Sequence, residues 1–293
     1  MAQVSIGRRL ARDLSLGLFL AFSCGLVWHA VQMADEWGIG WDAHAYYVAW
    51  SGNLYDHAPG TLDAYNYSPL FAQLTWPLTH LPWPVFCGLF IGAAALSIAW
   101  LVRPLPLPLA IGIWLFCTPE IVSGNVFWML ALCTVAGFTR GSPWCVAAFT
   151  KIVPCLGPVW FLLRGEWRRL GGFVATFVVL FAASYALGPS LWHQWWDFLE
   201  SNAGGTPSMG GIPPLVVRLP LAAVLLVFAA RTDRRWLVPV SMVLASPVVG
   251  WGTFAMLAAV PRLRGRGPAL DVAPAPGADT PAVSEPETRT LAT

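Results

Sequence analysis

Apolar runs recur along the chain, and short polar or basic segments separate them. At 1.5 Å per residue, a helix of about 20 apolar residues crosses a hydrocarbon core about 30 Å thick. The pattern predicts an all-α polytopic membrane protein with about nine to eleven hydrophobic helices, some of them short and broken. The clearest predicted spans are residues 14–31, 84–102, 105–119, 126–138, 171–187 and 215–230.

The first apolar run follows Arg8, Arg9 and Arg12. Because basic residues prefer the cytoplasmic side, the run predicts a retained first helix with its N-terminus in the cytoplasm. A cleaved signal peptide is the alternative. It is disfavoured because the run is long for one and because the next polar segment leads directly back into apolar sequence.

Three further apolar segments, residues 68–82, 144–163 and 237–260, contain internal Pro or Gly. Arg near span ends prefers the cytoplasmic side. All the Arg clusters lie on that side if 144–163 and 237–260 each form a short hairpin and 68–82 does not invert the topology. Broken helices at membrane depth are tolerated where they are buried in protein or line a cavity, so we expect a polar cavity in the outer half. The clusters are at residues 8–12, 103, 140, 164–169, 231–235 and 262–266.

The longest polar and aromatic segment, residues 35–67, directly follows the first span. We expect it to be an outer active-site loop. Residues 188–214 are rich in Gly, Pro and Trp and predict a second outer loop. From residue 267 to residue 293 the sequence turns to Pro, Ala, Thr and Glu, which is typical of a disordered tail. We therefore assign residues 1–266 to one membrane domain.

Composition agrees with this class and narrows the chemistry. The chain is 57% hydrophobic and 11% charged, with a mean hydropathy of +0.61, which excludes an ordinary soluble domain. The six Cys are scattered singly through apolar stretches, which argues against a zinc site or a disulfide framework. We expect no cofactor, no metal and no nucleic-acid partner, and we expect membrane lipids around the protein.

The predicted topology sorts the charged residues. Most acidic residues fall on the outer side, where Lys151, the single lysine, and Arg218 are the basic residues. A carboxylate beside an apolar groove and across from two cations suits sugar transfer from a lipid phosphate. The lipid tail would lie in the groove and the two cations would hold the phosphate, while a carboxylate takes the proton of the attacking hydroxyl.

Several short motifs follow one another in order along the chain. The first is Asp42 followed by Tyr46 and Tyr47. The others are residues 65–71 (YNYSPLF), Gly124-Asn125, residues 151–154 (KIVP), Arg218, and Ser246-Pro247 with Trp251. Together they resemble the GT-C class of polytopic glycosyltransferases, and within it glycosyltransferase family 87, which includes polyprenol-phosphate-mannose-dependent mannosyltransferases of mycobacteria. The resemblance covers roughly residues 10–262.

The resemblance implies a role for each matching residue. Asp42 would be the catalytic base, and Lys151 and Arg218 would contact the lipid phosphate. Substrate-binding roles are implied for Tyr46, Tyr47, Tyr67 and Asn125, and His44 in the same loop is a further candidate. The bland alternatives are a helix N-cap or solvated carboxylate for Asp42, span-end anchors for the two cations, and a packed or solvated His44.

The implied function is inverting, metal-independent transfer of a hexose, with mannose the first choice. The donor would be a polyprenyl-phosphate sugar, and the acceptor a lipid-linked or cell-envelope glycan such as a lipoglycan, at the outer face of the bacterial plasma membrane. A transporter or flippase for a lipid-linked sugar would use the same cavity without bond cleavage. A catalytically inactive partner subunit of envelope glycan assembly is the third hypothesis.

Overall fold

The computed structural model describes residues 2–202 and 208–264 of the chain. Within those ranges the chain forms helices and turns and no strand, which confirms the predicted all-α class. The predicted tail at residues 267–293 lies outside the described residues.

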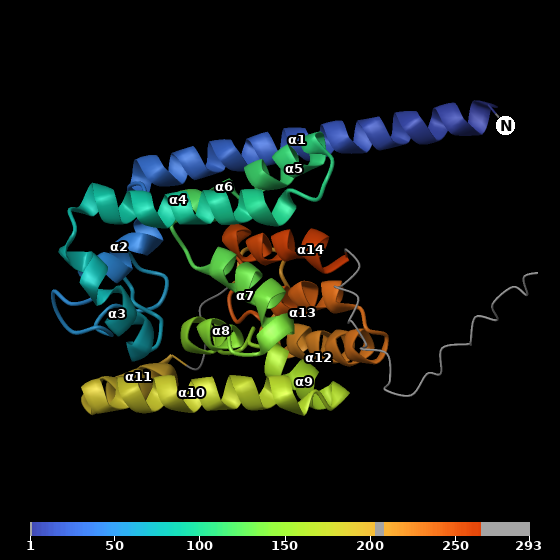
Figure 1. Cartoon of the computed structure of the whole chain (residues 1–293). Coiled ribbons are helices and arrows are strands. Elements are labelled where there is room, and N and C mark those ends of the chain that lie inside the picture. The colour runs from blue at the N-terminus through green and yellow to red at the C-terminus, as the bar shows by residue number, and fades with distance from the viewer. Residues whose placement is uncertain (1, 203–207, 265–293) are drawn as a thin grey trace, which may run out of the picture.

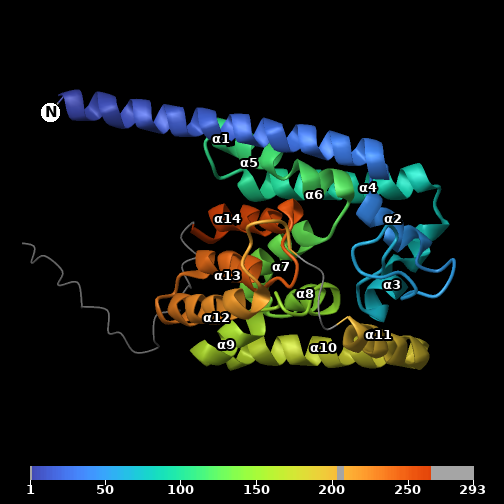
Figure 2. The same cartoon turned by 180° about the vertical axis from the view of Figure 1, so that it is seen from behind.

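Among the described residues, three helices are long and apolar enough to cross a membrane: α1 (Ala2–Trp37), α4 (Trp83–Val102) and α10 (Trp167–Leu187). Helices α1 and α4 lie along one side of the molecule and α10 along the opposite side (Figures 1 and 2). Apolar side chains such as Leu14 and Leu18, exposed by 61% and 64%, cover the outer surface of α1. An outward apolar surface of this kind is what a helix in contact with lipid requires.

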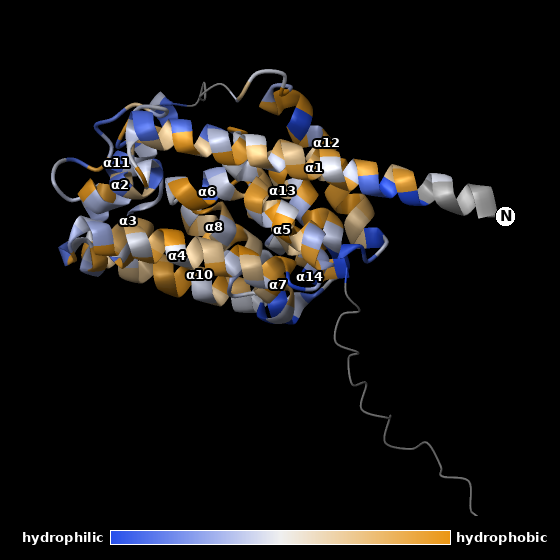
Figure 3. Ribbon diagram, turned by 90° about the horizontal axis from the view of Figure 1, so that it is seen from above, coloured by the Kyte–Doolittle hydropathy of each residue, from blue (hydrophilic) through white to orange (hydrophobic). Residues whose placement is uncertain are grey.

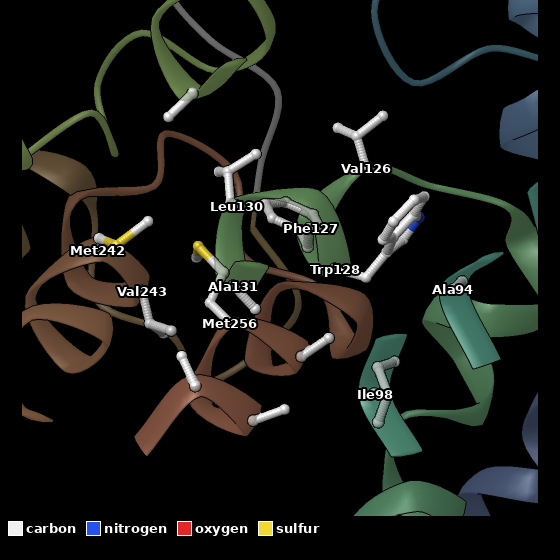
Figure 4. Packing of buried hydrophobic residues seen from close by; sticks show 14 of the residues in the cluster. Ala94, Ile98, Val126, Phe127, Trp128, Leu130, Ala131, Met242, Val243 and Met256 are labelled. Carbon is white, nitrogen blue, oxygen red and sulfur yellow. The ribbon is translucent and has the colours of Figure 1, made fainter. Parts of the chain in front are cut away.

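Shorter helices fill the space between these two sides. Helix α7 (Phe127–Arg140) lies at the centre, where its residues 127–131 pack against α4 and the C-terminal helices (Figure 4). The other short helices around it are α5 (Leu107–Phe116), α6 (Thr118–Ser123), α8 (Trp144–Thr150), α9 (Gly157–Arg164), α12 (Leu215–Arg231), η2 (Arg235–Leu237), α13 (Val238–Ala245), η3 (Trp251–Ala259) and α14 (Val260–Arg264).

The chain reverses after α8, as the hairpin predicted at residues 144–163 requires, because Cys155 Sγ returns to within 3.4 Å of the Trp144 carbonyl oxygen before α9 begins. The Trp144 side chain lies between Gly137 and Gly157. A Cβ on Gly137 would stand 2.4 Å from this indole, and a Cβ on Gly157 would stand 2.0 Å from it. The hairpin can therefore close only because both neighbours lack a side chain.

The second predicted hairpin is also confirmed. Helix α13 ends at Ala245, residues 246–250 are irregular, and η3 returns alongside α13. The segment predicted to bend at 68–82 forms the short helices α3 (Pro69–Thr75) and η1 (Trp76–His80). The Ser68 hydroxyl donates to the Phe149 carbonyl at 2.6 Å and joins this segment to α8.

The basic clusters gather at one end of the helix bundle. Arg262 donates to the Trp100 carbonyl at 3.1 Å, and Arg164 donates to the Ala230 carbonyl at 2.8 Å, so the ends of α4, α9, α12 and α14 meet there. The polar loop after α1 lies at the other end (Figure 1). Hydrophilic residues concentrate at the two ends and apolar residues between them (Figure 3), as expected for a protein that crosses a bilayer.

Three sequence predictions of local structure were wrong. Residues 188–214 do not form only a loop, because α11 (Pro189–Ser201) occupies the first half. Its Pro stands at the helix start, where a missing N–H costs nothing, and it buries Trp192 and Phe198 while leaving Trp196 60% exposed. The predicted span 105–119 is interrupted at Cys117, between α5 and α6, and the loop 35–67 contains α2 (Trp41–Val48).

Candidate active site

Asp42 is the second residue of α2, and a tight contact fixes the start of that helix. Gly40 has φ 77° and donates its N–H to the Val122 carbonyl at 2.9 Å. A Cβ on Gly40 would stand 2.5 Å from the Cys87 sulfur. Glycine is therefore required here by both conformation and space, and it holds Asp42 close to α6.

The two faces of α2 have different surroundings. Residues three or four apart share a helix face, and Asp42 and Tyr46 lie toward the turn between α6 and α7. His44 and Tyr47 lie toward α4, with their rings 4.9 and 5.3 Å from the Trp83 ring. The predicted loop residues are therefore divided between two sites.

Asn125 connects Asp42 to the aromatic core. Its side-chain amide donates to Asp42 Oδ2 at 3.0 Å. Its side-chain carbonyl accepts from the Tyr67 hydroxyl at 3.2 Å and from the Val126 N–H at 2.7 Å. The Tyr67 and Tyr46 hydroxyls are 3.0 Å apart. The carboxylate of Asp42 is thus held by a network of buried polar groups.

Gly124 explains the other half of the Gly124-Asn125 motif. It has φ 68°, and a Cβ there would stand 2.7 Å from the Cβ of Ala43. The absence of a side chain lets the turn approach α2 closely enough for Asn125 to reach Asp42.

Lys151 lies at the end of α8, where the chain reverses. Its Nζ is 5.0 Å from the centre of the Tyr67 ring and 4.5 Å from that of Phe127. The negative faces of the two rings favour an ammonium group at this position. The charge of Lys151 also acts on Asp42 across the site.

Asp42, Asn125 and Lys151 line one cavity of about 360 Å³. Its walls come from segments far apart in the sequence: α1, α2, the α6–α7 turn, the α8–α9 turn and residues 248–253. This cavity is hereafter the polar cavity. Its lining is completed by His29, Ala30, Met33, Trp41, Pro119, Ser123, Phe127, Val248, Gly250, Trp251, Gly252 and Thr253.

A second cavity of about 560 Å³ lies on the other face of α2. We call it the apolar cavity because Trp37, Ile39, Trp83 and Ile91 are among its lining residues, and His44 also lines it. Trp41 is common to the linings of both cavities.

The surroundings of Asp42 suit a proton acceptor. Burial raises the pKa of its carboxyl group above the usual value, and hydrogen bonds from Ser123 and Asn125 and the charge of Lys151 partly offset this effect. A carboxylate with a raised pKa binds a proton more strongly than an exposed one does.

The structure does not bring every predicted site residue into the polar cavity. Tyr46 and Tyr67 are buried behind it, where they hold Asn125. The Tyr47 hydroxyl donates to the Leu81 carbonyl at 3.1 Å. His44 Nδ1 is 2.6 Å from Asp63 Oδ1, on the side of the apolar cavity. Substrate contacts of these four residues stay predictions.

Arg218 also lies outside the lining of the polar cavity. Arg218 as a residue is only 3% exposed. Its guanidinium group donates to four backbone carbonyls and to the Ser208 hydroxyl. These bonds tie the start of α12 to the irregular segment after α13, which forms part of the cavity wall. The carbonyls are those of Pro213, Leu244, Ser246 and Pro247, at 2.7, 2.9, 2.7 and 3.0 Å.

Sequence reasoning does not identify Glu120 as a site residue. Glu120 belongs to α6, which lies between the apolar helices α5 and α7 in the sequence, and its side chain is fully buried. Its Oε1 accepts the Trp128 N–H at 3.1 Å. Burial raises its pKa to about 8, and the charge of Asp42 acts in the same direction. Its isolation between two apolar runs was the signal that could have identified it.

Within the described residues no three His, Cys, Asp or Glu side chains lie close enough together to hold a metal ion.

Residues 65–273, more than half of the chain, match the sequence model of glycosyltransferase family 87. The chain belongs to this family. It is therefore a membrane glycosyltransferase. Asn125, Lys151 and Arg218 fall within the match, whereas α2 and Asp42 precede it. Neither the curated proteins nor the solved structures compared with the chain gave a match.

Proposed function

We propose that this glycosyltransferase moves mannose from a polyprenyl phosphate to a hydroxyl of a lipid-linked or cell-envelope glycan, at the outer face of the bacterial plasma membrane. One observation carries the proposal. The Asp42 carboxylate and the Lys151 ammonium group line the same cavity, and Asn125 fixes the carboxylate. A base and a cation on one cavity match the two charges that develop when a hydroxyl displaces a phosphate.

In the proposed reaction the acceptor oxygen attacks the anomeric carbon as the bond from that carbon to the phosphate oxygen breaks. Asp42 takes the hydroxyl proton, and the electron pair of the broken bond leaves with the polyprenyl phosphate. Lys151 stabilises the phosphate anion as it departs. A single displacement of this kind inverts the anomeric centre, so a β-linked donor gives an α-linked product.

The apolar cavity supports a substrate with a lipid portion. It lies directly across α2 from the polar cavity and has room for part of an isoprenoid chain at about 560 Å³. Arg218 enters the proposal as a positioning residue, because it holds the wall segment rather than lining the cavity.

The proposal is tested by sugar transfer in membranes supplied with radiolabelled polyprenyl-phosphate-mannose. Wild type is compared with Asp42→Asn at matched expression, and with Asp56→Asn, which changes an exposed carboxylate of the same loop. We expect a new labelled product from wild type and from Asp56→Asn, and none from Asp42→Asn.

Equal transfer by wild type and Asp42→Asn would exclude Asp42 as the base. If wild type does not use the mannosyl donor, the same assay with an arabinosyl donor identifies a different sugar. Absence of transfer with any polyprenyl-phosphate donor would contradict the proposed donor class.

A further inference from the structure

Glu120 is a buried acid that the proposed reaction does not use. One of its oxygens caps the start of α7 through the Trp128 N–H, whereas Oε2 has no hydrogen-bond partner among the described residues. Oε2 points at the wall of the polar cavity, since a Cβ on Gly252, a lining residue, would stand 2.6 Å from it. The Glu120 carboxyl group thus lies just behind that wall.

The buried charges near Glu120 do not balance if every group is ionised. Asp42 and Glu120 are two acids, and Lys151 is the one cation whose charge acts on both of them within the described part of the chain. A buried charge without a partner is strongly unfavourable, and so is a buried anionic oxygen without a hydrogen bond. Asp42 has the better anion site, because Asn125 donates to it and it faces Lys151 across the cavity. Glu120 is therefore the group that should carry the proton.

We propose that Glu120 is a positioning residue that stays uncharged in the working enzyme, so that Asp42 is the single anion opposite Lys151, and that ionisation of Glu120 at alkaline pH inhibits transfer. The activity part of this inference rests on the proposed function of Asp42 and Lys151.

Loss of the Glu120 proton would act through both neighbours. A second anion beside Lys151 weakens the attraction of its ammonium group for the donor phosphate. The ionised Glu120 carboxylate also repels the negative charge that develops on the departing phosphate in the same site. Transfer should therefore fall as Glu120 ionises, first in the apparent affinity for the donor.

Other titratable groups face Glu120 from the elements packed around α6, and the test must separate them. These groups are Asp42 and Tyr46 on α2, Tyr67 before α3, Lys151 after α8 and Cys117 at the start of α6, while His29 on α1 lines the polar cavity. Burial raises the pKa of the two tyrosines and of Cys117 well above the usual values, and it lowers the pKa of Lys151. The test must therefore separate the alkaline titration of Glu120 from that of Lys151.

The first test compares pH profiles of mannose transfer for wild type, Glu120→Gln and the exposed-site control Glu36→Gln. The Gln side chain keeps the acceptor for the Trp128 N–H and cannot ionise. We expect wild type and Glu36→Gln to lose transfer above a pH of about 8, where Glu120 ionises. Glu120→Gln should keep its pH 7 rate within about twofold and lose the alkaline fall. An unchanged alkaline fall in Glu120→Gln would overturn the proposal, and so would inactivity of the folded variant at every pH.

The second test needs neither donor nor product, so it stays informative if the proposed function fails. The infrared spectrum of purified wild type at pH 7 should contain a carboxylic acid C=O band that disappears by pH 9. Asp42→Asn should keep this band and Glu120→Gln should lose it. A wild-type spectrum without such a band at pH 7 would overturn the proposal, and this reading does not require Glu120→Gln to fold. If the band titrates as expected but no sugar is transferred, the proposed function fails and the charge assignment stands.

Discussion

The side-chain amide of Asn125 donates to Asp42 Oδ2 at 3.0 Å, across 83 positions of the sequence. This bond orients the carboxylate toward the polar cavity. We expect Asn125→Ala to lower the transfer rate about tenfold or more, because a hydrogen bond to a charged group contributes about 1.5–3 kcal/mol. The check is the transfer rate at saturating donor. Asn53→Ala, at an exposed position, is the control and should match wild type.

Gly124 should tolerate no side chain. Gly124→Ala places a Cβ 2.7 Å from that of Ala43 and puts Ala at φ 68°. We expect destabilisation of about 1–3 kcal/mol from backbone strain and crowding. Thermal unfolding in detergent measures it, and Gly52→Ala, which meets nothing within 4 Å, is the control. Equal melting temperatures for the two variants would show that the turn can move away from α2.

Lys151→Met should remove the positive charge that the leaving phosphate needs. Truncating one partner of a buried charge pair costs about 2–5 kcal/mol, so we expect transfer to fall by at least about thirtyfold. Lys151→Arg keeps the charge and should recover part of the activity. Full activity of Lys151→Met at subsaturating donor would contradict a phosphate-binding role.

Arg218→Lys separates a structural role from a phosphate-binding one. Lysine cannot reproduce the fork of bonds to the carbonyls of residues 213, 244, 246 and 247, so the wall segment should loosen. We expect a loss of about 2–3 kcal/mol of stability, seen as a lower melting temperature. The control is Arg231→Lys at an exposed position. A raised KM for the donor with unchanged melting would instead support direct contact with the phosphate.

The acid side of the pH profile should report Asp42. Its pKa is raised by burial, and a base works only when it is deprotonated. The transfer rate should therefore be maximal above the raised pKa of Asp42 and should fall as the pH decreases through that pKa. The fall should occur at a higher pH than it would for an exposed aspartate. The measurement is kcat from pH 3 to pH 7. A rate that stays constant down to the ordinary aspartate value of 3.8 would show that burial does not control this group.

The long apolar helices and the two hairpins were predictable because their signals are local. Residues 84–102 and 171–187 are continuous apolar runs. Each hairpin segment contains internal Pro or Gly, and a straight span at either segment would place Arg clusters on opposite sides of the membrane. Helix α11 was not predictable in this way. Its Gly188-Pro189 start is typical of a loop, and only tertiary contacts of Trp192 and Phe198 show that it has a buried face.

The candidate site was predictable in its residue types and not in its geometry. Asp42, Asn125 and Lys151 were expected to act together, and they line one cavity. The division of α2 into two faces, which sends His44 and Tyr47 elsewhere, depends on a helix that polar loop composition concealed. Glu120 was missed because its burial depends on Gly252, more than a hundred residues later in the sequence.

Trp41 is common to the linings of the polar and apolar cavities. The two compartments therefore share one residue of their walls, and a shift of Trp41 would change both. If the proposed donor places its lipid in one cavity and its sugar in the other, selection of the two portions is coupled through Trp41.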